Sequence, residues 1–211
     1  MVKVKGDAVR IQTSILNASE KKVLVWLAQR QPRWVTSDIL TGIGTFGAVA
    51  EDPMDEEGVF DQYRDEMIRY YSNIVGKYGV PVQSALKKLA GLPVERICST
   101  HGPVWQTCLK DVIGLYDKMS RYEVERGVCI VYGSMYGNTA AAADALAMEL
   151  EKRGIPYAVH DLACNNAGEL GVSGALRDVF KYDTIVAGSP TYNNGIFPPV
   201  ETFMNALQAR L

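Results

Sequence analysis

Hydrophobic positions in the second half of the chain switch between two periods, which predicts strands and helices in turn. Residues 128–132 are apolar at consecutive positions, as in a strand that is buried on both faces of a parallel sheet. Between Ala143 and Leu150 the apolar residues recur at i, i+3, i+4 and i+7, the spacing of a helix packed on a sheet. Residues 155–162 predict a second strand and residues 184–189 a further buried one. The pattern therefore indicates an α/β fold with a parallel sheet.

The first half has a different pattern. Tyrosine, methionine and isoleucine line one face of a helix over about residues 61–77, which Gly79 and Pro81 are expected to end. A short helix over residues 82–89 and a strand over residues 96–99 are expected next. The charged stretch after these elements predicts a linker between two parts of the chain.

The turn between the strand ending at Tyr132 and its helix is the strongest functional signal. It is rich in hydroxyls and small residues, contains no Lys or Arg, and leads to a helix N-terminus, where backbone N–H groups favour an anion. A cradle without a lysine suits the single phosphate of FMN. The candidate phosphate-binding residues are Ser134, Met135, Tyr136, Gly137, Asn138 and Thr139. The alternative is an ordinary strand–turn–helix with small residues in the turn.

A second candidate loop follows the strand over residues 184–189. Ligands of open α/β sheets bind at the carboxyl ends of the strands. Here a tyrosine offers a ring face, while Asn and Gly tolerate positive φ and can turn amides toward a ring edge. The candidate ring-binding residues are Pro190, Thr191, Tyr192, Asn193, Asn194 and Gly195. The alternative is a plain turn before a helix that starts at Pro198 and Pro199.

Composition excludes several classes. The net charge of −2 and the lack of a basic run disfavour nucleic-acid binding. No segment approaches the roughly 20 apolar residues that span a bilayer, and the N-terminus has no signal-peptide core, so we expect a cytoplasmic protein. The four cysteines form no CxxC pair and are expected to be reduced thiols.

The phosphate turn resembles that of the flavodoxin family. The residues that fill its pattern are Ile130, Val131, Tyr132, Ser134, Gly137, Thr139, Ala143 and Leu146. Together with the helix over residues 67–78, the His101-Gly102-Pro103 turn and Phe46-Gly47, residues 38–211 resemble the flavodiiron proteins. In that family a metallo-β-lactamase-like domain precedes a flavodoxin domain, and a head-to-tail dimer brings one subunit's FMN to the other's iron.

The resemblance implies a flavoprotein oxidoreductase that reduces dioxygen or nitric oxide, with electrons from a rubredoxin-like or reductase donor. The chain departs from the family in the residues that would bind the metal. Two irons need about seven oxygen and nitrogen ligands, but the His-x-Glu-x-Asp-His run is absent and Gly44 stands where the family has a bridging aspartate. Only His101 matches an iron ligand, so a diiron site is not expected in this chain unless a partner supplies the other ligands. His160 is expected to be a half-buried strand residue.

The expected architecture is a partial metallo-β-lactamase-like α/β segment followed by a partial flavodoxin-like parallel sheet with flanking helices. Residues 1–120 are assigned to the first part (1–34 without an assignment), residues 121–127 to the linker and residues 128–211 to the second. Flavodoxin-like sheets have the strand order 2-1-3-4-5. The last two strands are not found here, so the chain looks like an internal piece, and the strand over residues 184–189 should have an unpaired edge.

Three functions follow as hypotheses. The first is an FMN-binding electron carrier related to the flavodiiron reductases. The second is one subunit of a split reductase, completed by a partner chain. The third is a non-catalytic truncated remnant. A homodimer or a complementing chain is the expected assembly.

Overall fold

The computed structural model describes residue 55 and residues 58–99, 103–164 and 170–211. The chain divides into two compact units, residues 1–37 and 38–211, and every described residue belongs to the second. The predictions for residues 1–34, for Gly44 and Phe46-Gly47, and for His101 lie outside the described residues. The domain and linker boundaries stay predictions.

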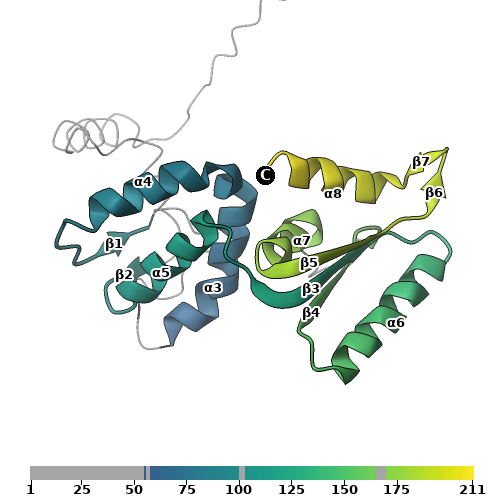
Figure 1. Ribbon diagram of the computed structural model, residues 1–211, viewed down its shortest axis with the longest axis horizontal. Helices are drawn as coiled ribbons and strands as arrows, with labels where there is room; N and C mark the ends of the chain where they lie inside the picture. The colour runs from purple at the N-terminus through teal and green to yellow at the C-terminus, as the bar shows by residue number, and fades with distance from the viewer. Residues whose placement is uncertain (1–54, 56–57, 100–102, 165–169) are drawn as a thin grey trace, which may run out of the picture. The chain divides into compact units, whose positions relative to one another are not determined.

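The described residues between 58 and 120 form three α-helices and a two-stranded sheet (Figure 1). The first helical segment runs through α3 (Val59–Tyr70), the π-helical η1 (Tyr71–Val75), the 3-10 turn η2 (Gly76–Tyr78) and α4 (Gly79–Leu89). Strands β1 (Ile97–Cys98) and β2 (Val104–Trp105) pair antiparallel, and α5 (Leu109–Ser120) follows. The strand predicted over residues 96–99 is confirmed by β1.

The prediction that Gly79 and Pro81 end the first helix is wrong. Both lie in the first turn of α4, where Pro is tolerated because the first amides of a helix have no intrahelical partner. A Cβ on Gly79 would lie 2.5 Å from the carbonyl oxygen of Ser120. Glycine therefore serves here for the close packing of α4 on α5, rather than as a helix stop.

The helical segments pack around an apolar core to which Phe180, directly after α7, also contributes. Met67, Tyr71 and Trp105 are fully buried in it, and Tyr71 packs edge-on against Tyr116 at 5.6 Å between ring centroids. Asp55 closes one end of this core, because its carboxylate accepts hydrogen bonds from the three backbone amides of residues 106–108, which lead into α5. No pattern in the sequence pointed to this acidic residue.

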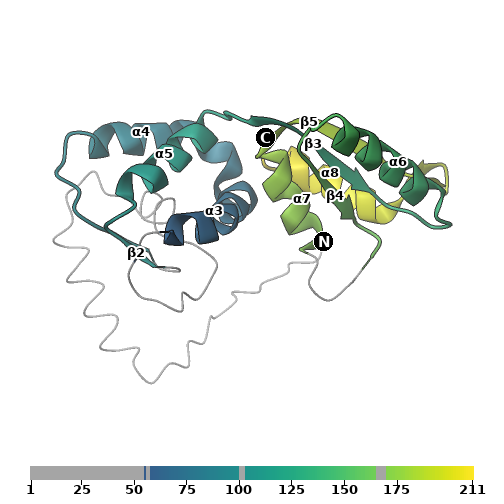
Figure 2. The ribbon, with the colours of Figure 1, turned by 90° about the horizontal axis from the view of Figure 1, so that it is seen from below.

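The second half contains a three-stranded parallel sheet in the order β4-β3-β5 (Figures 1 and 2). Its elements are β3 (Glu125–Tyr132), α6 (Asn138–Lys152), β4 (Tyr157–Asp161), α7 (Gly171–Val179), β5 (Tyr182–Gly188), the short strands β6 (Thr191–Tyr192) and β7 (Gly195–Ile196), and α8 (Pro198–Gln208). The predicted α/β class is confirmed. Strand β3 starts inside the stretch that was predicted to be a linker.

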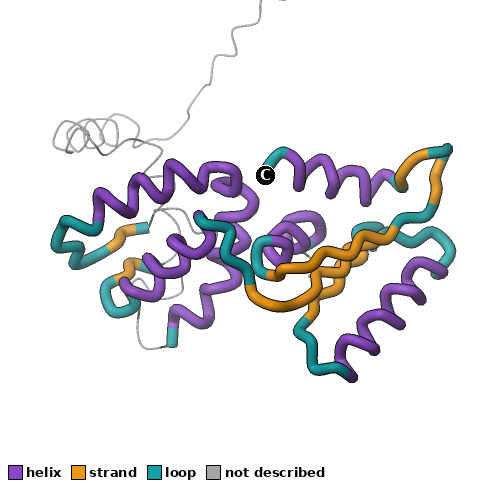
Figure 3. The backbone as a smooth tube through the Cα atoms, in the orientation of Figure 1, coloured by secondary structure: helices purple, strands orange, loops and turns teal. Residues whose placement is uncertain are grey.

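Helices cover both faces of the sheet, as the tube in Figure 3 shows. Val128, Ile130 and Tyr132 of β3 face the apolar side of α6. Cys129 and Val131 point the other way and pack with residues of α7 and α8 such as Leu176 and Phe203. This alternation explains the uninterrupted apolar run of β3, because both of its faces are buried.

Strand β5 is not buried, contrary to the prediction from its apolar sequence. Among the described residues it pairs only with β3, so the predicted unpaired edge is present. Ile185 is 42% exposed and Val186 37% exposed, on opposite faces, whereas their partners on β3, Cys129 and Ile130, are buried. The sequence pattern is that of a central strand, and the position is that of an edge strand.

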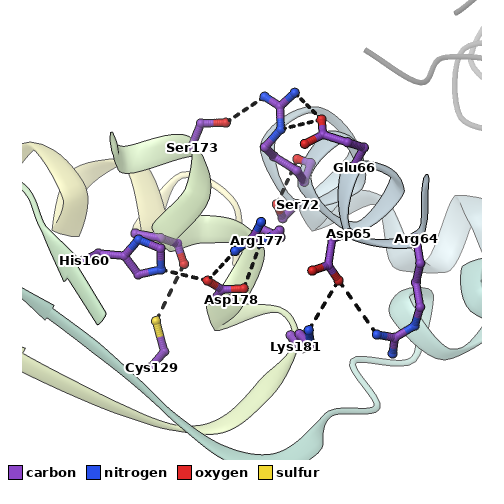
Figure 4. Close-up of polar contacts among 12 residues, drawn as sticks. Arg64, Asp65, Glu66, Ser72, Cys129, His160, Ser173, Arg177, Asp178 and Lys181 are labelled. Carbon is purple, nitrogen blue, oxygen red and sulfur yellow. Dashed lines mark hydrogen bonds and ion pairs between the residues drawn. The ribbon is translucent and has the colours of Figure 1, made fainter. Parts of the chain in front are cut away.

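A polar cluster ties α7 to β4 (Figure 4). The carboxylate of Asp178 is 2% exposed and lies 2.8 Å from Nε2 of His160, and both its oxygens accept hydrogen bonds from the guanidinium of Arg177. His160 is 15% exposed, as expected for a half-buried strand residue. Arg69 of α3 donates a hydrogen bond to the hydroxyl of Ser173, which links the helical segments to α7.

Candidate functional site

The two predicted binding loops leave the sheet at the same edge. Tyr132 and Gly188 are the last residues of the parallel strands β3 and β5 and lie opposite each other in the ladder. The N–H of Gly133 donates a hydrogen bond to the carbonyl oxygen of Gly188 at 3.1 Å. This bond holds the two backbone segments together directly beyond the end of β3. The structure therefore brings residues 134–139 and residues 190–195 to one end of the sheet.

The first loop turns directly into a helix N-terminus. Gly137 has φ of +86°, in the left-handed region that glycine adopts without strain, and its amide donates to the hydroxyl oxygen of Ser134 at 3.1 Å. Helix α6 begins at Asn138 with no side-chain cap. The N–H of Ala141 donates to the carbonyl oxygen of Gly137, so the first amides of the helix precede the start of its hydrogen-bond ladder. The turn therefore offers N–H and O–H hydrogen-bond donors to an anion, but no Lys or Arg side chain.

Two glycines beside the loops allow the backbones to approach closely. A Cβ on Gly133 would lie 2.8 Å from the ring of Phe197, and a Cβ on Gly188 would lie 3.0 Å from the methyl group of Thr139. Any larger side chain would push the two loops apart. Sequence reasoning did not assign Gly133, Gly188 or Phe197 to the site, although the two glycines at the ends of apolar strand sequences were a usable signal.

The second loop is a small β-hairpin rather than an irregular turn. Strands β6 and β7 pair antiparallel around Asn193 and Asn194, whose φ angles are +46° and +61°. Positive φ at both central residues is what a type I′ hairpin turn requires, and Asn tolerates it. This agrees with the expected backbone freedom of the two asparagines, but the hairpin itself was not predicted.

The hairpin is tied to the start of α8. The hydroxyl of Ser189 accepts a hydrogen bond from the N–H of Phe197 at 3.0 Å and donates to the carbonyl oxygen of Pro190. The rings of Tyr192 and Phe197 lie 5.9 Å apart between centroids. Helix α8 starts at Pro198, as predicted. Ser189 is therefore a supporting residue that the sequence reasoning missed.

Aromatic and apolar side chains at this end of the sheet face solvent. Tyr136 is 86% exposed and Tyr192 is 42% exposed. Met135 and Ile196 are also exposed. Each of the two loops thus exposes an aromatic ring and an aliphatic side chain. The ring faces are available for stacking against a planar ligand.

Metal-ligating groups do not gather in the part of the chain that the structure describes: no group of three or more His, Cys, Asp or Glu side chains there could hold an ion. The Nε2 atom of His160 is hydrogen-bonded to the carboxylate of Asp178. His101 lies outside the described residues, so its assignment as an iron ligand stays a prediction. The described cysteines Cys98, Cys108, Cys129 and Cys164 are not joined by disulfides.

Comparison with known proteins gives a family match for the second half. Residues 130–210 match the model of the flavodoxin family. The chain is 29% identical to a putative diflavin flavoprotein of Nostoc sp. over 89% of its own length and 34% of the relative's. It is also 29% identical to the anaerobic nitric oxide reductase flavorubredoxin of Aeromonas hydrophila, over 71% of its own length and 29% of the relative's.

A solved structure agrees in fold. The flavodiiron protein of Giardia intestinalis superposes with a TM-score of 0.71 at 23% identity, covering 81% of this chain and 41% of that protein. The chain spans about a third of the length of the curated relatives that it matches.

These findings confirm two predictions. The predicted resemblance to the flavodiiron proteins, with a flavodoxin-like region at the C-terminal side, is confirmed by the two relatives and the family match, and the match to the flavodoxin model supports FMN as the cofactor. None of the helices in the described ranges is long and apolar enough to cross a membrane.

Proposed function

Taking the chain as a flavodiiron-type protein with a flavodoxin-like C-terminal region, we propose that it holds FMN between its two loops and serves in electron transfer. The observation that carries the proposal is the turn after β3. It ends in a helix N-terminus and combines a hydroxyl, a left-handed glycine and backbone donors, without any Lys or Arg. FMN, when bound, supplies the chemistry by accepting and donating electrons, while the chain sets its binding and its potential.

The phosphate is assigned to residues 134–139. Ser134 and Thr139 contribute hydroxyls, and the amides of Met135, Tyr136, Gly137 and Asn138 contribute N–H donors. Because the hydroxyl of Ser134 now accepts from the amide of Gly137, both groups must turn to the phosphate when it binds. The partial positive charge of the α6 N-terminus favours the dianion by up to about 2 kcal/mol.

The ring is assigned to the hairpin over residues 190–195. Tyr192 presents a ring face. Asn193 and Asn194 form the tip of the turn and Gly195 follows them in β7, so their amides can be directed toward the ring edge. Pro190 and Thr191 lead from the sheet into the hairpin and fix its start. Tyr136 on the other loop is exposed enough to cover the opposite side of a planar ligand.

The partners belong to the same proposal. The name of the Aeromonas relative points to rubredoxin-type electron transfer, so we expect a rubredoxin-like or reductase donor in the cytoplasm. The assembly is a homodimer or a complex with a complementing chain. Reduction of dioxygen or nitric oxide would need iron ligands from such a chain beside His101. A remnant without chemistry is the competing hypothesis, and it differs from the carrier in not binding FMN.

Titration of the purified chain with FMN, followed by quenching of flavin fluorescence, tests the proposal. Gly137→Asp adds a carboxylate and left-handed strain beside the phosphate. Gly154→Asp is a matched control, since Gly154 has φ of +63° and open space around its Cβ position, at the other end of the same helix.

We expect saturable binding that Gly137→Asp weakens by at least about tenfold. A carboxylate ~6 Å from a phosphate dianion costs ~1.4 kcal/mol even at the dielectric constant of water. Gly154→Asp should leave the dissociation constant unchanged. A chain that leaves FMN fluorescence untouched at all concentrations, with a native circular dichroism spectrum, would exclude the carrier.

A further inference from the structure

Gly188, the last residue of β5, lies on the face of the sheet that α6 covers. It is opposite Tyr132 in the ladder, and the side chain of Tyr132 packs with α6. A Cβ on Gly188 would lie 3.0 Å from Cγ2 of Thr139 and 3.3 Å from Cβ of Tyr132. The methyl group of Thr139 therefore borders the space that a side chain at position 188 would need. Gly188 is not one of the glycines with positive φ, so space is the reason for glycine here.

The position of this methyl group decides where the hydroxyl of Thr139 points. Both groups are attached to the same Cβ, so the hydroxyl cannot point toward Gly188 while the methyl group does. Threonine in a helix divides between two χ1 rotamers, and a contact that accepts only the methyl group selects one of them. The hydroxyl of Thr139 makes no hydrogen bond within the described ranges, so it is available to a ligand.

We propose that Gly188 is a positioning residue for the phosphate of FMN and acts through Thr139. By leaving room for the methyl group, Gly188 keeps Thr139 in the rotamer whose hydroxyl donates to the phosphate. The inference rests on the proposed function, because it concerns the same phosphate loop. It adds to phosphate recognition a residue from the strand that leads into the ring-binding hairpin.

The backbones on both sides of this contact are fixed, so the side chain of Thr139 has to yield when a larger residue replaces Gly188. The N–H of Gly133 donates to the carbonyl oxygen of Gly188 at 3.1 Å, in continuation of the ladder between β3 and β5. On the other side, Ala140 and Ala143 pack α6 on β3. A methyl group at position 188 should therefore turn Thr139 about χ1, since a side-chain rotation disturbs less packing than a shift of the helix or the sheet.

The dissociation constants of FMN and riboflavin, measured by fluorescence quenching, test the inference. Riboflavin lacks the phosphate, so its binding does not depend on the hydroxyl of Thr139. A hydrogen bond to a charged group changes a dissociation constant about tenfold or more. Gly188→Ala should therefore weaken FMN binding by at least about threefold and leave riboflavin binding unchanged. Gly114→Ala, where the Cβ enters open space on α5, is the control and should change neither.

A double-mutant cycle tests whether Gly188 acts through Thr139. Thr139→Ser keeps the hydroxyl and removes the methyl group, so the hydroxyl is distributed over three rotamers and FMN should bind about threefold more weakly. In this background Gly188→Ala should have no further effect, because the methyl group that it displaces is gone. The same loss from Gly188→Ala in both backgrounds would overturn the inference.

Thr139→Val keeps the shape of the side chain and removes the hydroxyl, so it tests the inference even if Gly188→Ala fails to fold. It should weaken FMN binding about tenfold and spare riboflavin. Native FMN affinity of Thr139→Ser or Thr139→Val, or an equal loss of both flavins in Gly188→Ala, would overturn the inference and leave FMN binding by the native chain intact. A native chain that binds neither flavin would refute the proposed function, and the inference with it.

Discussion

Replacement of Asp178 by Asn should remove a large electrostatic contribution to stability at neutral pH. Burial by itself would raise the pKa of Asp178, but the hydrogen bonds from His160 and Arg177, together with the Arg177 charge, outweigh it and lower the pKa to about 2. The ordinary value is 3.8, so the carboxylate is favoured in the folded chain.

The magnitude follows from the shift. A difference of nearly two pKa units corresponds to about 2 kcal/mol of unfolding free energy, at roughly 1.4 kcal/mol for each unit. Because the pKa is lower in the folded state, the unfolded chain binds more protons at acid pH. The contribution is therefore complete above about pH 5 and is lost as the pH falls through 4 toward 2.

Urea unfolding of the FMN-free chain at several pH values measures this effect. Asp178→Asn should lower the unfolding free energy by about 2 kcal/mol at pH 7, and the difference from the native chain should shrink as the pH falls toward 2. Asp144→Asn on the exposed side of α6 is the control and should be neutral. A native-like stability of Asp178→Asn at pH 7, or a difference that does not depend on pH, would refute the reasoning.

Three further predictions concern stability and thiol chemistry. Asp55→Ala should cost about 1–2 kcal/mol in urea unfolding, because it leaves three backbone amides before α5 without their acceptor; a loss below about 0.5 kcal/mol would contradict this. Gly127→Ala should lower the thermal midpoint, because a Cβ there would lie 2.3 Å from a tyrosine ring of β5. Gly114→Ala in the open middle of α5 should instead stabilise the chain by about 0.5–1 kcal/mol. A higher midpoint for Gly127→Ala than for Gly114→Ala would contradict the close packing of Gly127 against β5. The exposed Cys98 should react at once with a thiol reagent. Cys129 should react only after unfolding, because its burial in β3 raises its pKa to about 12. Rapid labelling of both cysteines would show that β3 is accessible to the reagent.

The second half of the fold could be predicted because its local signals agree with one another. The apolar run of β3, the helical stripe of α6 and the glycine after it each indicate the same βαβ unit, and the structure places them within a few residues of the predicted bounds. The prolines at the start of α8 acted in the same way.

Sequence failed where packing decides the outcome. Gly79 was interpreted as a helix stop, yet it lies in α4. Glycine is needed there because the backbone of α5 comes too close for a side chain. The apolar sequence of β5 indicates burial, yet a strand is buried only if other elements cover it, and that information is not local. Asp55 binds the backbone amides that lead into α5 from more than 50 residues away in sequence, and no spacing rule finds such a contact.

For the candidate site, the sequence indicated which residues belong together but not how they are supported. Ser134, Gly137 and Tyr192 were predicted from residue type and position after a strand. Gly133 and Ser189 act through contacts between the two loops, and these appear only when β3 and β5 are placed side by side.

The central claim is that amides and hydroxyls of residues 134–139 bind a phosphate without a cation. The most direct measurement compares the dissociation constants of FMN and riboflavin, which differ only in that phosphate. We predict that the native chain binds FMN at least about tenfold more tightly, a difference of ~1.4 kcal/mol, and that Gly137→Asp abolishes the preference. Equal affinity of the native chain for both flavins would contradict the account.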